Sequence, residues 1–151
     1  MIEARDILIV DNDELFANLM RTKMRMLGLP HIIHTDPARA VEEVQTNRRI
    51  GLLWTDLHMP GMSGIEVARI ARNERPEMPI ILATAGDLEE EEEQALYQAG
   101  VDLTVSKFDL STKAIREFLR LAHINRLASL DLMPKPGYLD SAPGFFESKS
   151  I

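Results

Sequence analysis

The chain carries five short, mostly apolar runs, and each is followed by a segment in which apolar residues recur at helical spacing. The runs cover residues 7–10, 31–34, 52–55, 79–84 and 101–106. Short apolar runs rich in β-branched residues are typical of strands that are buried on both faces of a sheet. Helices are predicted over residues 15–27, 37–44, 65–73, 87–100 and 111–128, and Asp87 and Glu90 have the spacing of a capping box at the start of the fourth. The pattern therefore predicts strands and helices that alternate along the chain.

This alternation predicts a doubly wound α/β fold, in which a five-stranded parallel sheet has helices on both faces. Right-handed crossovers bring the carboxyl ends of all the strands to one edge of such a sheet. Open α/β sheets bind their ligands at that edge, so the residues that follow the strands should reveal the function. We expect the domain to cover residues 1–128 and an irregular C-terminal extension to cover residues 129–151.

Polar side chains stand where four of the predicted strands end. Asp11 and Asn12 follow the first strand, Asp56 follows the third, Thr84 closes the fourth and Lys107 follows the fifth. Carboxylates held close together repel each other and require a cation, and oxygen ligands favour Mg²⁺. A carboxylate in such a site can act as a nucleophile and form an aspartyl phosphate. An ammonium group and a hydroxyl group would then hold the phosphoryl oxygens.

Four segments resemble the landmark motifs of response-regulator receiver domains, which have a flavodoxin-like fold. They are ILIVDNDE at residues 7–14, WTDLHMPGMSG at 54–64, ATA at 83–85 and SKF at 106–108. The resemblance runs from residue 5 to about residue 125, and the second segment is the most specific. It implies that Asp56 is the phosphoacceptor and that Asp11 belongs to an acidic Mg²⁺ pocket. It further implies that the backbone carbonyl of His58 binds the metal, and that Thr84 and Lys107 contact the phosphoryl group.

The sequence departs from the family pattern at three positions. Asn12 stands where a second acidic metal ligand is usual, so we expect weaker metal binding, and Asp13 is expected to cap the first helix. The proline usual after the lysine is missing, and Phe108 follows Lys107 directly. A trans peptide bond and a rearranged loop are therefore expected there. Thr104 replaces the usual aromatic switch residue on the fifth strand, which puts family-style coupling by aromatic rotation in doubt.

The composition limits the partners and the location. A net charge of −7 over 151 residues disfavours a broad surface for nucleic acid, because that binding depends on Lys and Arg. The absence of cysteine excludes disulfides and thiolate metal sites. No run approaches the roughly 20 apolar residues that span a bilayer, and the chain enters its first strand without a signal peptide. We expect a cytoplasmic protein that binds neither nucleic acid nor a membrane directly.

The last predicted helix has more apolar surface than one packed face requires. Leu121, Ile124 and Leu127 lie beside the stripe that should face the sheet. We expect this helix and the extension to form a homodimer or a partner surface. The alternative is that the extension folds back and covers the second stripe within one monomer. No output domain follows, so we expect a stand-alone receiver or a piece that was cut within a linker.

The expected activity is Mg²⁺-dependent transfer of a phosphoryl group from a histidine kinase or a histidine phosphotransfer protein to Asp56, followed by slow hydrolysis. Such a protein is a signalling switch rather than a turnover enzyme. Two alternatives stay open. The first is a degenerate receiver that binds partners without phosphorylation, in line with Asn12, Thr104 and the missing proline after Lys107. The second is a phosphatase with an aspartate nucleophile, although His58 stands where that class has a second acidic residue.

Overall fold

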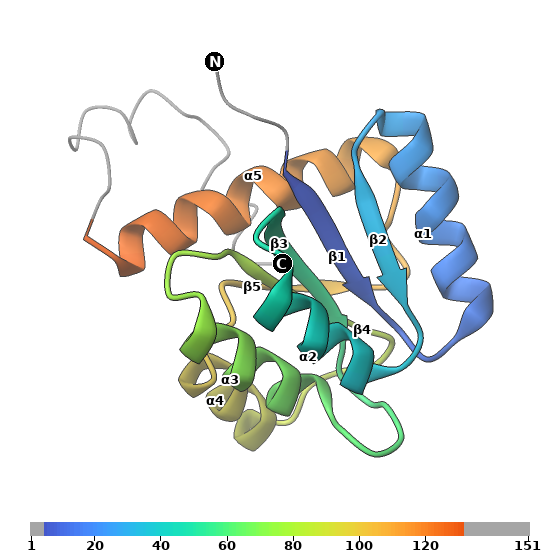
Figure 1. Ribbon diagram of the computed structural model, residues 1–151. Helices are drawn as coiled ribbons and strands as arrows, with labels where there is room; N and C mark the ends of the chain where they lie inside the picture. Colours follow the sequence, from blue (N-terminus) through green and yellow to red (C-terminus); the bar gives the residue numbers. More distant parts are fainter. Residues whose placement is uncertain (1–4, 132–151) are drawn as a thin grey trace.

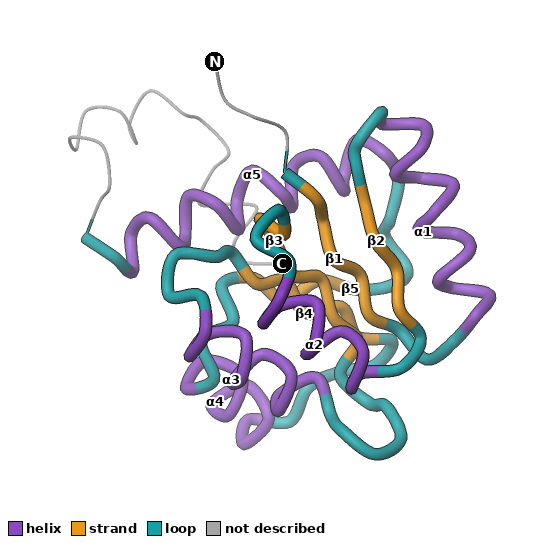
Figure 2. The backbone as a smooth tube through the Cα atoms, in the orientation of Figure 1, coloured by secondary structure: helices purple, strands orange, loops and turns teal. Residues whose placement is uncertain are grey.

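The computed structural model describes residues 5–131, and these form a five-stranded parallel sheet in the order β2-β1-β3-β4-β5 (Figures 1 and 2). In chain order the elements are β1 (Asp6–Val10), α1 (Glu14–Leu27), β2 (His31–His34), α2 (Pro37–Thr46), β3 (Ile50–Asp56), α3 (Gly64–Glu74), β4 (Ile80–Thr84), α4 (Glu90–Gln98), β5 (Leu103–Ser106) and α5 (Thr112–Ser129). The predicted doubly wound α/β fold is thereby confirmed. None of the helices within residues 5–131 is both long and apolar enough to cross a lipid bilayer.

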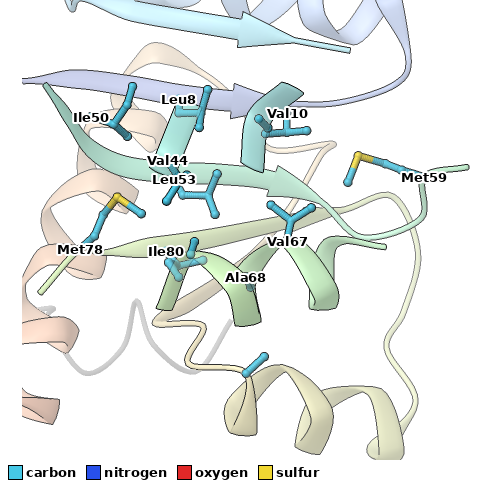
Figure 3. Close-up of a cluster of buried hydrophobic side chains, with 13 residues drawn as sticks. Leu8, Val10, Val44, Ile50, Leu53, Met59, Val67, Ala68, Met78 and Ile80 are labelled. Carbon is cyan, nitrogen blue, oxygen red and sulfur yellow. The ribbon is translucent and has the colours of Figure 1, made fainter. Parts of the chain in front are cut away.

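The sheet is covered by α1 and α5 on one face and by α2, α3 and α4 on the other (Figure 1). Alternate strand residues face opposite sides, so neighbours such as Leu53 and Trp54 join different hydrophobic clusters. Leu53 packs with Leu8, Ile80 and Val67 beneath α2 and α3 (Figure 3). Trp54 packs beneath α1 and α5 and is buried.

Side-chain caps fix where the helices begin after the loops of the functional edge. Asp13 accepts hydrogen bonds from the Leu15 and Phe16 N–H groups at the start of α1, as predicted. A capping box was expected from the spacing of Asp87 and Glu90, and this prediction is wrong. The box in α4 begins at Glu89 instead, and the Glu92 carboxylate accepts from the Glu89 N–H. The run of glutamates offers the same spacing at successive positions, so the pattern alone left the register of the helix undecided.

A buried polar network fixes the end of the sheet opposite the functional edge. The Asp102 carboxylate accepts hydrogen bonds from the Ile80 N–H and from Arg72, both at 2.9 Å. Arg126 of α5 lies 3.6 Å from the same carboxylate, and Asn125 donates to the Asp102 carbonyl. The last turns of α5 are therefore tied to the start of β5.

The second apolar stripe of α5 is less open than the sequence suggested. Leu121 is 0% exposed and Ile124 is 8% exposed, while Leu127 is half-buried. The expected homodimer stays a prediction, and so does the domain boundary at residue 128. Residues 132–151, on which the alternative of a folded-back extension depends, lie outside the described residues.

Candidate functional site

Three charged side chains from distant parts of the sequence meet at the carboxyl edge of the sheet. Lys107 Nζ lies 2.5 Å from Asp11 Oδ2 and 3.1 Å from Asp56 Oδ1. β1 and β3 are neighbours, and Val10 pairs with Thr55, so the parallel register sets the two carboxylates side by side. Both acidic residues are buried, and the Lys107 side chain is 12% exposed. The edge therefore holds two carboxylates around one ammonium.

Backbone hydrogen bonds orient each of the three groups. Asp11 Oδ1 accepts from the Asp13 N–H at 2.9 Å, and Asp56 Oδ1 accepts from the Leu57 N–H at 2.9 Å. The Lys107 N–H donates to the Thr84 carbonyl at 3.0 Å, which extends the pairing of β5 with β4 by one residue. Within residues 5–131, no hydrogen bond reaches Asp56 Oδ2, so this oxygen stays available for chemistry.

The loop that follows Asp56 is pinned at both ends. Met59 is 9% exposed and extends into the cluster that contains Val10 and Val67, close to the end of β3 (Figure 3). At the far end of the loop, the Gly64 N–H donates to the Leu57 carbonyl at 2.8 Å. A Cβ atom at Gly64 would lie 2.0 Å from the Asp56 carbonyl oxygen. Glycine is therefore required there by the close approach of α3 to the backbone of Asp56.

Burial and charge oppose each other in the site. Burial raises the pKa of the Asp11 carboxyl, and the nearby Lys107 ammonium lowers it only in part. Burial alone would lower the pKa of Lys107, but the two carboxylates outweigh burial and raise it. The ammonium is thus firmly charged, whereas the Asp11 carboxylate is incompletely stabilised by the lysine alone. Its Oδ2 atom is buried and lacks a hydrogen bond of regular geometry within the described residues.

The donor set fits a divalent cation that prefers oxygen ligands. The under-stabilised Asp11 Oδ2 atom and the Asp56 carboxylate are hard oxygen donors at one point of the edge. No group of three or more His, Asp or Glu side chains in the described part of the chain is arranged as a metal cluster. A cation site here would therefore rest on two carboxylates, supplemented by neutral oxygens.

The remaining predicted site residues lie around this centre. Thr84 is buried at the end of β4, and its hydroxyl is 3.4 Å from the backbone of Gly86. Asn12 is exposed, and no hydrogen bond joins its side chain to another described residue. The His58 side chain is also exposed, and its Nε2 lies 3.6 Å from Glu92 of α4. The structure thus unites Asp11, Asp56 and Lys107 but not the Asn12 and His58 side chains.

The departures from the family pattern have local structural consequences. All peptide bonds within residues 5–131 are trans, as expected for the bond between Lys107 and Phe108. The Phe108 N–H donates to the Ser106 hydroxyl at 3.1 Å, and the Phe108 ring is 82% exposed. Thr104 is half-buried and lines a cavity of about 490 Å³ between α4, β5 and α5.

Sequence reasoning missed one residue of the site, Phe16. Lys107 Nζ lies over its ring, 4.4 Å from the centroid. The residue stands in the first turn of α1, five positions after Asp11, and its spacing alone reads as helix packing. The available signal was an aromatic residue in the first helical turn directly after the edge carboxylate.

Comparison with known sequences finds response regulators and a sensor protein of two-component signalling. The family model of the response regulator receiver domain matches residues 7–120. The chain is 26% identical over 106 residues to the response regulator protein FleR of Pseudomonas aeruginosa, and this match covers 70% of the chain and 22% of FleR. It is 30% identical over 125 residues to the sensor protein EvgS of Escherichia coli, and this match covers 81% of the chain and 10% of EvgS. The chain corresponds to a small part of each of these longer proteins.

Solved structures share the fold. A CheY-like receiver domain protein from Methanospirillum hungatei superposes with a TM-score of 0.74 at 21% identity, over 84% of this chain and 99% of that one. The chemotaxis protein CheY4 of Vibrio cholerae gives a TM-score of 0.71 at 19% identity, over 78% of this chain and 98% of that one. The covered part of the chain therefore has the architecture of these proteins.

Proposed function

The chain belongs to the response regulator receiver family of two-component signalling, and on that premise we propose that it is switched by transfer of a phosphoryl group to Asp56. The observation that carries the proposal is the arrangement of one ammonium between two buried carboxylates, in which no donor among the described residues reaches Asp56 Oδ2. A nucleophilic oxygen beside a fixed positive charge is what an in-line phosphoryl transfer requires.

The proposed step exchanges one phosphorus bond for another. Asp56 Oδ2 attacks the phosphorus of a phosphohistidine, a P–O bond forms, and the P–N bond breaks with its electron pair passing to the imidazole nitrogen. Hydrolysis reverses the switch when a water oxygen binds phosphorus and the acyl phosphate bond breaks, which returns the carboxylate and inorganic phosphate. Oδ1 is held meanwhile by the Leu57 N–H, so the carboxylate cannot rotate freely during attack.

Lys107 and Thr84 are the groups that would hold the phosphoryl oxygens. The Lys107 ammonium stands 3.1 Å from the attacked carboxylate, and two anchors limit its movement: the backbone bond to Thr84 and the ion pair with Asp11. Among residues 5–131 the Thr84 hydroxyl makes only long contacts of 3.4 Å, so it can turn toward a ligand.

Mg²⁺ is the proposed cofactor, with Asp11, Asp56, the Asn12 side chain and the His58 carbonyl as its ligands. When bound, it would neutralise negative charge on the incoming phosphoryl group. Asn12 supplies an oxygen without a charge, so the site would bind the ion less tightly than one with three carboxylates.

A protein donor, namely a histidine kinase or a histidine phosphotransfer protein, suits the surface around the site. Leu15 and Phe108 flank the edge and are each 82% exposed, and Leu19 follows one turn later on α1 at 44%. Exposed apolar side chains grouped around a reactive centre favour docking of another protein. Because such donors obtain their phosphoryl group from ATP, we also assign the chain to the cytoplasm.

The test is incubation with Mg²⁺ and acetyl phosphate, followed by the mass of the intact protein. The parent should gain one phosphoryl group and lose it slowly, and Asp56→Asn should gain none while melting like the parent. A degenerate receiver would gain nothing in either form. An aspartate-dependent phosphatase would release inorganic phosphate in many turnovers, and either result would refute the switch.

A further inference from the structure

The ring of Phe16 forms one wall of the site around Lys107. Lys107 Nζ lies over the ring face, 4.4 Å from its centroid, while the same atom contacts Asp11 and Asp56. The lysine side chain is only 12% exposed, so the ring takes a place that water would otherwise fill. An ammonium over an aromatic face is attracted by the ring quadrupole, and the attraction grows when water is excluded.

Hydrogen bonds connect the backbone of Phe16 to Asp11, one of the two carboxylates that Lys107 contacts. Asp11 Oδ1 accepts from the Asp13 N–H, and Asp13 Oδ1 accepts from the Leu15 and Phe16 N–H groups. The ring also packs against the cluster between the sheet and α1. Asp11 is therefore linked to Phe16 in two ways: through the hydrogen bonds of the α1 cap, and through the Lys107 ammonium, which contacts both the Asp11 carboxylate and the Phe16 ring.

The ion pair alone does not fix the ammonium. Lys107 Nζ contacts two carboxylates at once, 2.5 Å from Asp11 Oδ2 and 3.1 Å from Asp56 Oδ1. The two carboxylates compete for the same ammonium, so neither ion pair by itself sets its position. The ring face limits the movement of the ammonium from the third side.

We propose that Phe16 is a positioning residue, which holds the Lys107 ammonium between Asp11 and Asp56 in readiness for the phosphoryl group. The role in the reaction rests on the proposed function, whereas the contact itself does not. A further consequence is that the lysine stays in position although no proline follows it and Phe108 is exposed.

The contact is tested first without any phosphorylation, by NMR of the full chain. A ring current shifts groups above an aromatic face upfield, so the ε-methylene resonances of Lys107 should lie upfield of those of Lys23 and Lys113. Phe16→Leu should return them to the range of the other lysines. Unshifted Lys107 resonances in the parent protein would overturn the inference, whatever the labelling experiments give.

The role in the reaction is tested by the rate at which acetyl phosphate labels the intact chain at saturating Mg²⁺. Phe16→Leu should slow labelling roughly fivefold, and Phe16→Tyr, which keeps the ring face, should label like the parent. Phe118→Leu is the matched control, because Phe118 is also half-buried and packs on the same cluster from α5. It should lower the melting temperature about as much as Phe16→Leu without slowing labelling.

Each outcome has one meaning. Equal labelling rates for Phe16→Leu and the parent, or equal slowing by Phe16→Tyr, would overturn the positioning role. Equal slowing by Phe118→Leu would reduce the effect to general loss of packing and overturn it as well. If Phe16→Leu does not fold, Phe16→Met takes its place. A parent that gains no label refutes the proposed function instead, and the NMR comparison still decides the contact.

Discussion

Replacing Gly64 by alanine should destabilise the fold and disturb Asp56 at the same time. The added Cβ would lie 2.0 Å from the Asp56 carbonyl oxygen and 2.9 Å from its carbonyl carbon. Cβ atoms essentially never approach other atoms closer than 3.0 Å, so the backbone must separate by about 1 Å. Both neighbours are backbone atoms, and neither can move aside as the end of a flexible side chain can.

The expected cost is the balance of two effects. Overpacking of this kind costs about 1–3 kcal/mol, and a clash with backbone belongs at the upper end. Alanine at a helical position recovers up to about 1 kcal/mol relative to glycine. The net loss of about 2 kcal/mol corresponds to a melting temperature lower by about 4–8 °C for a chain of this size. Since misplacement by about 1 Å can cost about a hundredfold in rate, phosphoryl labelling should slow by at least roughly tenfold.

Thermal unfolding followed by circular dichroism and the acetyl phosphate labelling rate measure the two effects. Gly86→Ala is the control for stability, because nothing lies within 4 Å of the Cβ it would add. It should melt at or slightly above the temperature of the parent. A Gly64→Ala chain that melts and labels like the parent would refute the close packing of α3 against the phosphoacceptor strand.

Other perturbations test separate parts of the account. Asn12→Asp should tighten Mg²⁺ binding in a Trp54 fluorescence titration, because it restores a negative charge, and an unchanged affinity would exclude Asn12 as a ligand. Asp102→Ala should cost about 3–5 kcal/mol in urea unfolding because it removes the counter-charge of Arg72 and Arg126, against less than about 1 kcal/mol for the half-exposed Glu117→Ala. Burial raises the pKa of Asp102, so the folded chain binds that proton more tightly than the unfolded chain. The free energy of unfolding should therefore fall as pH rises from about 4 toward the folded pKa, a slope that Asp102→Asn should lack. Truncation after Ala128 should yield monomers if the extension builds a dimer, and should cause self-association or lower the melting temperature if it covers α5. A truncated chain with the mass of the parent in light scattering and the same melting temperature would contradict both ideas.

Local sequence patterns were enough to predict the sheet and the residues that meet at its carboxyl edge. The apolar runs around Leu8 and Leu53 predict two parallel strands. Asp11 and Asp56 follow these strands and therefore lie close together, since strand ends in such a sheet share one edge. The placement of Lys107 needed only the same argument. The cap of α4 could not be predicted, because several glutamates offer equivalent spacing and only packing against the sheet selects one register.

Contacts that depend on the direction of a side chain could not be predicted from the sequence. The contact between the Phe16 ring and Lys107 depends on how the first turn of α1, which Asp13 caps, packs against the end of β5. The His58 side chain lies beside Glu92 of α4, and nothing in the spacing of the motif indicates that contact. Site residues whose position depends on tertiary packing, rather than on local propensity or strand order, could therefore be identified only from the structure.

The most direct test of the central claim is to identify the residue that receives the phosphoryl group from a protein donor. The chain would be mixed with a phosphorylated histidine phosphotransfer protein, and the acyl phosphate would be reduced with borohydride, which converts a phosphorylated aspartate to homoserine. Peptide mass spectrometry should find homoserine at position 56 alone, and none after reaction of Asp56→Asn. Homoserine at Asp11 or Asp13, or at no position while the donor keeps its phosphoryl group, would contradict the account.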